Sequence, residues 1–133
     1  MFCIKDYHVG LSTLIHSQDS KHVYEVRGPL GEPLGVKKAG VHVAFTAGTG
    51  VLPLMDLVAH VFYTALGINN KIGVSLDDQV GPDFSFKLYV SFRSRKEAVG
   101  LELLEAIHAY FKKTGNPSFE LVLRMSDESE SKA

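Results

Sequence analysis

The stretch VHVAFTAGTGVLP, residues 41–53, carries the strongest fold signal in this chain. Its first six residues form an apolar, β-branched run, which is typical of a short strand in the middle of a parallel sheet. Two glycines then end the run. Pro53 suits the first turn of a helix, because the N–H that proline lacks has no partner there. The stretch therefore predicts a strand, a glycine-rich turn and a helix in direct succession.

The helix expected from Pro53 carries apolar residues at helical spacing, and Gly67 is a natural end for it. Residues 68–83 are polar and predict a long loop. The apolar residues that we expect on the buried side of this helix are Leu54, Leu57, Val58, Val61, Phe62 and Ala65.

Two strands and a second helix are predicted after that loop. The strands are Phe84–Phe92 and Phe119–Met125, and the helix between them is expected from about Arg95 to Lys113, ended by the glycine and proline of residues 114–117. The apolar stripe expected on this helix consists of Val99, Leu103, Ile107 and either Tyr110 or Phe111.

From residue 41 onward the predicted order is strand, helix, strand, helix, strand. Such alternation implies right-handed crossovers and an α/β fold, here a partial doubly wound parallel sheet. Ligands of such sheets lie at the carboxyl ends of the strands. Topology and glycine content therefore both indicate residues 47–53 as a binding loop.

The first forty residues are turn-rich and mixed. Lys21–Arg27 alternates well enough to predict a strand, and the glycines and prolines of residues 28–35 predict a loop after it. The last residues, Ser126–Ala133, are acidic and serine-rich, so we expect a disordered tail. The predicted organisation is an N-terminal region of residues 1–35, a nucleotide-binding domain of residues 36–125 and a tail of residues 126–133.

Composition excludes several classes of protein. The chain has 133 residues, 14 basic and 15 acidic, so no basic excess favours nucleic acid. One cysteine excludes an internal disulfide and a cysteine-built metal site. The apolar run of residues 41–66 is interrupted by glycine, proline, Asp56 and His60, which argues against a transmembrane segment. We expect a cytoplasmic or otherwise intracellular protein, with membrane association only through a partner.

The glycine loop has a specific chemical use. Glycines allow the backbone to approach a pyrophosphate closely, and the N–H groups and the positive end of a following helix attract the anion. The spacing of Gly48 and Gly50 matches neither a Walker loop nor the six-residue dinucleotide fingerprint. On spacing alone, a tight turn without a ligand is an equal alternative.

Residues 47–55, AGTGVLPLM, resemble the Gly-Thr-Gly-hydrophobic-Thr/Ala-Pro loop of the ferredoxin–NADP reductase superfamily, which includes the cytochrome b5 reductases. Residues 28–31, GPLG, resemble the turn that closes the flavin domain of that family. Residues 10–13, GLST, resemble the start of the helix that holds the FAD pyrophosphate, and residues 87–95 resemble the second strand of the nucleotide domain and its adenosine-binding turn. The resemblance covers roughly residues 8–125 in the family's order.

The resemblance implies an oxidoreductase that binds NAD(P)H, passes hydride to a flavin (FAD) and sends electrons to a haem or iron–sulfur acceptor. Thr49 is the implied catalytic-site residue, because the family's loop lies between flavin and nicotinamide. The implied nucleotide contacts are Gly48, Thr49, Gly50, Val51 and Pro53 in the loop, with Arg93 and Arg95 at the adenosine end. The implied flavin contacts are Gly10, Ser12 and Gly28.

Arg93 and Arg95 would favour NADP over NAD, because arginine binds a ribose 2′-phosphate in bidentate fashion; the alternative is that both are solvated loop residues.

The chain also departs from the family. Leu52 stands where the family has threonine, serine or alanine, and the Arg-x-Tyr-Ser/Thr flavin motif and the Cys-Gly strand are absent. Residues 1–35 would then be only a remnant of the flavin-binding barrel. The alternative function is a non-catalytic nucleotide-binding or structural subunit of a larger assembly. A flavin domain or an electron-acceptor protein is the expected partner. The six histidines lack ligand spacing, and no metal site is predicted.

Overall fold

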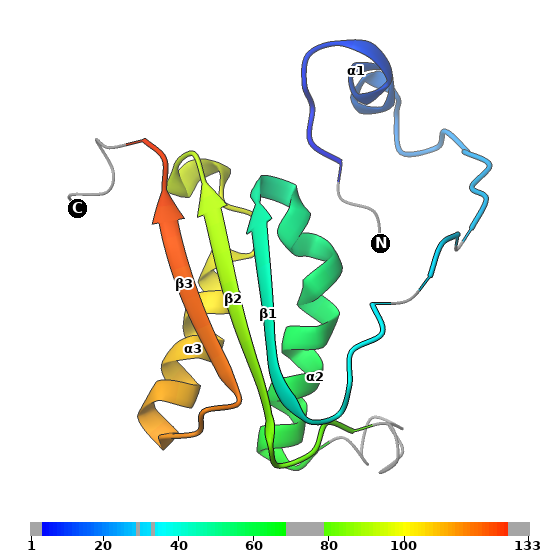
Figure 1. The fold of residues 1–133 in the computed structure, drawn as a ribbon. Helices are drawn as coiled ribbons and strands as arrows, with labels where there is room; N and C mark the ends of the chain where they lie inside the picture. The colour runs from blue at the N-terminus through cyan, green and yellow to red at the C-terminus, as the bar shows by residue number, and fades with distance from the viewer. Residues whose placement is uncertain (1–3, 29, 33, 69–78, 128–133) are drawn as a thin grey trace. The chain divides into compact units, whose positions relative to one another are not determined.

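The computed structural model describes residues 4–28, 30–32, 34–68 and 79–127 (Figure 1). The chain divides into two compact units, Met1–Gly35 and Val36–Ala133. In the first unit lies helix α1 (Gly10–Ser17). The elements of the second unit are β1 (Gly40–Ala47), the 3-10 helix η1 (Gly48–Leu54), α2 (Met55–Leu66), β2 (Phe84–Phe92), the 3-10 helix η4 (Arg95–Glu97), α3 (Leu101–Thr114) and β3 (Phe119–Met125).

The three strands form one parallel sheet in the order β1-β2-β3. The predicted α/β alternation of three strands and two helices is therefore confirmed, and the bounds of β2 and β3 are those predicted. Two successive right-handed crossovers that step in the same direction place both helices on the same face of the sheet. Figure 1 shows α2 and α3 together behind the strands.

The core lies between the sheet and these two helices. Alternate residues of β2 are buried on that side, and so are the first residues of β3. Burial of this apolar surface is the main stabilising term of the unit. The buried hydrophobic residues are Val51, Leu54, Val58, Val61, Phe84, Phe86, Leu88, Val90, Phe92, Leu101, Leu104, Ile107, Phe111, Phe119 and Leu121.

The helical run after β1 begins earlier than predicted. Residues 48–54 form a 3-10 helix, and the α-helix starts only at Met55. The tighter winding of a 3-10 segment carries the chain directly from the strand into the helix. Pro53 lies inside this helical run. Gly67 ends α2 in the left-handed conformation, with φ of +67°, as predicted.

The helix predicted over Arg95–Lys113 is interrupted, and its predicted apolar stripe is partly wrong. Gly100 adopts a φ of +70°, so the α-helix begins at Leu101. From that start Leu104, Ile107 and Phe111 face the core, whereas Leu103 is 55% exposed. The spacing of three and four residues fits both stripes, and only packing on the sheet selects one of them.

The first unit contains no strand within residues 4–28, 30–32 and 34–35, so the strand predicted over Lys21–Arg27 is wrong. A strand needs a partner that accepts its hydrogen bonds, and the alternation of side chains does not supply one. Local polar contacts organise the unit instead. The Asp6 carboxylate accepts hydrogen bonds from the His8 N–H and the Thr13 hydroxyl.

The tail begins later than predicted. The N–H of Ser126 donates to the carbonyl of Phe92, and the N–H of Asp127 donates to that of Arg93. These two residues are therefore hydrogen-bonded to the end of β2, although β3 itself ends at Met125. Residues 128–133, the remainder of the predicted tail, lie outside the described residues.

Candidate functional site

The glycine loop lies at the carboxyl edge of the sheet, where ligands of parallel sheets bind. Gly48 follows directly on β1, whose last residue, Ala47, pairs with Ser91 of β2. Ser91 pairs in turn with Arg124 of β3. The loop, the end of β2 and the end of β3 therefore meet at one edge, as the predicted topology required.

The two glycines of the loop differ in what the fold demands of them. Gly48 has a φ of +53°, a conformation that side chains disfavour, so the backbone itself requires glycine there. Gly50 has no positive φ, and a Cβ built on it meets no atom within 4 Å. The fold of the described chain does not require glycine at position 50. Its missing side chain leaves open space above the start of the helical run.

The remaining loop residues divide into an anchor and an exposed part. Val51 is fully buried, so its side chain holds the loop on the core and only its backbone can meet a ligand. Thr49 is half-buried, and no other described residue hydrogen-bonds its hydroxyl. Pro53 is exposed. The N-cap residue, Ala47, makes no side-chain hydrogen bond to the first N–H groups of the run, so it leaves these donors at the positive end of the run available to an anion.

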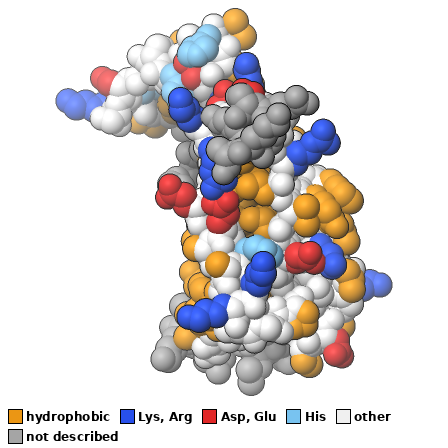
Figure 2. Space-filling view, turned by 90° about the vertical axis from the view of Figure 1, so that its left-hand side faces the viewer, with side chains coloured by type: hydrophobic (Ala, Val, Ile, Leu, Met, Phe, Trp, Pro, Cys, Tyr) orange, Lys and Arg blue, Asp and Glu red, His pale blue; other side chains and the backbone are white. Residues whose placement is uncertain are grey.

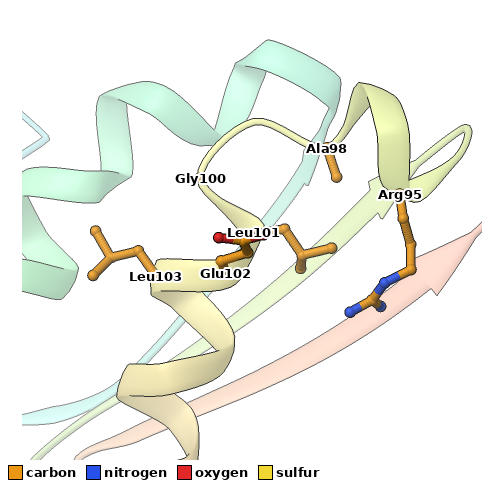
Figure 3. Close-up of a pocket in the computed structure, with 6 residues that line it drawn as sticks. All are labelled: Arg95, Ala98, Gly100, Leu101, Glu102 and Leu103. Carbon is orange, nitrogen blue, oxygen red and sulfur yellow. The ribbon is translucent and has the colours of Figure 1, made fainter.

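Arg95 does not point to the glycine loop. Its Nη2 atom donates to both carboxylate oxygens of Glu105, at 2.9 and 2.8 Å, which binds it to α3. It lines a hollow of about 400 Å³ with Gly100 and Leu101. Figure 3 shows the Arg95 and Leu101 side chains directed toward one another, while Leu103 points away. The structure therefore separates the two arginines that the sequence grouped.

Arg93 is exposed directly after β2. Beside it lies Asp127, through the hydrogen bond from the Asp127 N–H to the Arg93 carbonyl. Asp127 was expected in a disordered tail, and its carboxylate at this edge is not apparent in the sequence. Only the backbone hydrogen bonds beyond the end of β3 place it there.

The three residues matched to the flavin helix and turn lie in the first unit. Gly10 begins α1 with a φ of +65°. The Ser12 hydroxyl donates to the Val9 carbonyl and accepts the Tyr7 N–H, both at 3.1 Å. Ser12 therefore holds its own helix start together. Gly28 has no positive φ and lies in an irregular segment.

Two histidines serve the packing of the second unit. The Nδ1 atom of His108 on α3 accepts the N–H of Leu121 on β3 at 3.2 Å, and Nε2 of His60 on α2 accepts the N–H of Val80 at 3.3 Å. Over the part of the chain that the structure describes, no group of three or more metal-ligating side chains forms.

No known protein family, curated protein or solved structure matches the chain. Among the described residues, one helical run, Gly48–Leu66, is long and apolar enough to cross a membrane by length and composition alone. This is weak evidence for a membrane span, because core helices of soluble proteins satisfy the same criterion. In this structure Val58 and Val61 of that run are buried in the core beneath the sheet.

Proposed function

We propose that the chain binds a nicotinamide dinucleotide at residues 48–53, as the nucleotide-binding part of a flavin-dependent reductase. In such an enzyme hydride passes from the nicotinamide to a flavin, and electrons continue to a haem or iron–sulfur acceptor. The observation that carries the proposal is the open space at Gly50, at the carboxyl edge of a parallel sheet. The oxygens of a pyrophosphate there would accept hydrogen bonds from the first N–H groups of the helical run.

Two side chains beside the loop bear on the choice of nucleotide. Arg93 is the candidate partner of a ribose 2′-phosphate, whereas Asp127 is the candidate acceptor for the ribose hydroxyls of NAD. Arg95 takes a lesser part, because Glu105 already engages its guanidinium. Binding of both nucleotides to the Arg93→Ala and Asp127→Ala variants tests this assignment. Loss of NADPH binding in the first variant alone would select NADP.

The residues present do not fit a flavin. The Ser12 hydroxyl is engaged by its own turn, and the described residues of the first unit contain no strand and no buried side chain. In the proposed reductase the flavin would therefore be held by another part of the enzyme. The second candidate function, which the same observation supports, is a nucleotide-binding or structural subunit without a flavin of its own. The absorbance of the purified protein separates the two. A yellow protein with flavin bands would refute the second candidate.

The loop itself is tested by a matched pair of glycine variants. Gly50→Ala leaves the stability unchanged or raises it by about 0.4–1 kcal/mol, because the native φ suits alanine, yet its methyl group enters the space proposed for the pyrophosphate. Gly48→Ala costs about 1 kcal/mol, because its φ is positive. Thr49→Trp fills the same space with a larger side chain.

The measurement is the melting temperature with and without NADPH or NADH. A ligand present at about 100 times its dissociation constant adds about 2.7 kcal/mol to the stability. We expect this shift in the wild type and its loss in Gly50→Ala and Thr49→Trp. A shift that persists in Gly50→Ala would place the nucleotide elsewhere, and no shift in the wild type would refute nucleotide binding.

A further inference from the structure

The face of the sheet opposite the helices has a regular composition. Within the strand register, its β1 column is Val41, Val43, Phe45 and Ala47, its β2 column is Ser85, Lys87, Tyr89 and Ser91, and its β3 column is Glu120, Val122 and Arg124. No described element of the second unit covers this face. In Figure 2 hydrophobic side chains gather along the right-hand side of the view, which is the face that Figure 1 shows in front of the helices.

The apolar part of this face is concentrated on β1. Val41 is 67% exposed, Val43 49% and Phe45 79%. Parallel sheets are almost always covered on both faces, and their strands are then apolar on both sides. The β1 sequence has this property, so its outer column is built for burial. The charged residues on β2 and β3 lie beside this column, so a partner that buries it must also carry charges that complement them.

A second copy of the chain satisfies that restriction. The central row of the face is Phe45, Tyr89 and Val122, which pair across the three strands. The rings of Phe45 and Tyr89 stack at 4.8 Å with an angle of 21° between them. A two-fold axis along this row brings two sheets face to face with antiparallel strands. Each residue of the row then meets its own counterpart, so the apolar β1 columns cover each other.

The same axis pairs opposite charges. Glu120 precedes Val122 by two residues and Arg124 follows it by two, so Glu120 of one copy meets Arg124 of the second copy, twice. Lys87, which forms an ion pair with Glu120 at 2.9 Å, meets Ser91. No like charges face each other in this arrangement.

We propose that the chain forms a two-fold dimer through this sheet face, with Phe45, Tyr89 and Val122 on the axis and Glu120–Arg124 ion pairs on both sides. The dimer is independent of what the glycine loop binds. The face measures about 26 Å along the strands and about 14 Å across them. Two such faces give roughly 700 Å² in total, which is smaller than a standard stable interface, so we expect weak association that depends on concentration.

Sedimentation of the full chain over a range of concentrations tests the dimer. We expect the wild type to pass from monomer to dimer as its concentration is raised. Phe45→Lys weakens association at least tenfold. Leu103→Lys, which adds the same charge at an exposed leucine on the opposite side of the core, leaves association unchanged. Circular dichroism verifies that both variants are folded.

Charge reversal tests the pairing itself. In Arg124→Glu, the new glutamate of each copy faces Glu120 of the other copy. In Glu120→Arg, the new arginine of each copy faces Arg124 of the other copy. Each variant alone is therefore monomeric, because like charges face each other at both positions. A mixture of the two restores both ion pairs and forms a heterodimer. If Glu120→Arg unfolds through the loss of its pair with Lys87, Arg124→Glu and Phe45→Lys still decide the question.

A monomeric wild type at every concentration would overturn the proposal and leave the face to a different partner. Equal weakening by Phe45→Lys and Leu103→Lys, or association that survives both Phe45→Lys and Arg124→Glu, would show that another surface carries the contact. Failure of two folded charge-reversed variants to associate when mixed would refute the Glu120–Arg124 pairing and therefore the axis.

Discussion

The two units of this chain treat their apolar residues in opposite ways. Every buried hydrophobic residue of the described chain lies in the second unit, between Val51 and Leu121. The first unit carries Val9, Leu11 and Leu14 on or beside a helix, and all three are exposed. Apolar residues at helical spacing therefore do not suffice for a core. The second unit has one because a sheet presents a continuous surface onto which two helices pack.

Phe111→Ala is the substitution for which we expect the largest loss of stability. Phe111 is 1% exposed and its ring contacts those of Phe62 and Phe119. Its loss leaves a cavity and costs about 3–5 kcal/mol, measured by urea unfolding. The control, Leu11→Ala in the first unit, changes the stability by less than about 0.5 kcal/mol. A larger cost for Leu11→Ala would show that the first unit has a core after all.

Removal of one histidine from each unit tests the same difference between the units, with a smaller expected change in stability. His108→Ala leaves the partly buried N–H of Leu121 without its acceptor and costs about 1–3 kcal/mol. His16 of α1 also contacts a backbone group, the carbonyl of Ile4 at 2.7 Å, but at an exposed position. His16→Ala leaves the unfolding midpoint in urea within the error of the wild type. Equal effects of the two substitutions would contradict the difference between the units.

Deletion of residues 1–35 removes the first unit and leaves the buried residues of the second unchanged. We expect the unfolding free energy of the remaining chain to stay within about 0.5 kcal/mol of the full chain, because no core residue is lost. Thermal unfolding followed by circular dichroism measures it. Aggregation or loss of a cooperative transition after the deletion would show that the second unit needs the first.

The smallest effect concerns acid stability. The hydrogen bond from Lys87 lowers the pKa of Glu120 below its ordinary value of 4.5, so this carboxylate stabilises the fold above that pH and the contribution is lost as pH falls through the folded pKa. The hydrogen bond from the His8 N–H lowers the pKa of Asp6 in the same direction, from 3.8.

Glu120→Gln therefore makes the decline of global stability in acid shallower, as measured by urea unfolding between neutral and acid pH. Asp6→Asn leaves that decline unchanged and alters only hydrogen exchange in α1, because Asp6 belongs to the unit without a core. An effect of Asp6→Asn on global stability as large as that of Glu120→Gln would contradict the claim that only the second unit has a core.

Sequence reasoning located the candidate site better than its chemistry. Strand and helix alternation placed the glycine loop at the carboxyl edge, and the structure agrees. The sequence does not show that the fold requires glycine at position 48 and not at position 50, because only the backbone angles reveal this difference. The sequence also does not reveal that Arg95 forms an ion pair with Glu105, ten residues later, or that the Asp127 N–H is hydrogen-bonded to the Arg93 carbonyl. Those facts depend on where a helix begins and on how the chain continues beyond the end of a strand.

Short-range signals in the sequence predict most of the elements of the second unit. The alternation of Phe84–Phe92 and of Phe119–Met125 marks both strands, and Gly67 and Gly115 end the helices, because these signals act over a few neighbouring residues. Only the tertiary structure decided that Leu104 rather than Leu103 faces the core, and that both helices cover one face. Strand order and helix facing arise from contacts between distant residues, and those contacts leave Phe45 exposed on the other side.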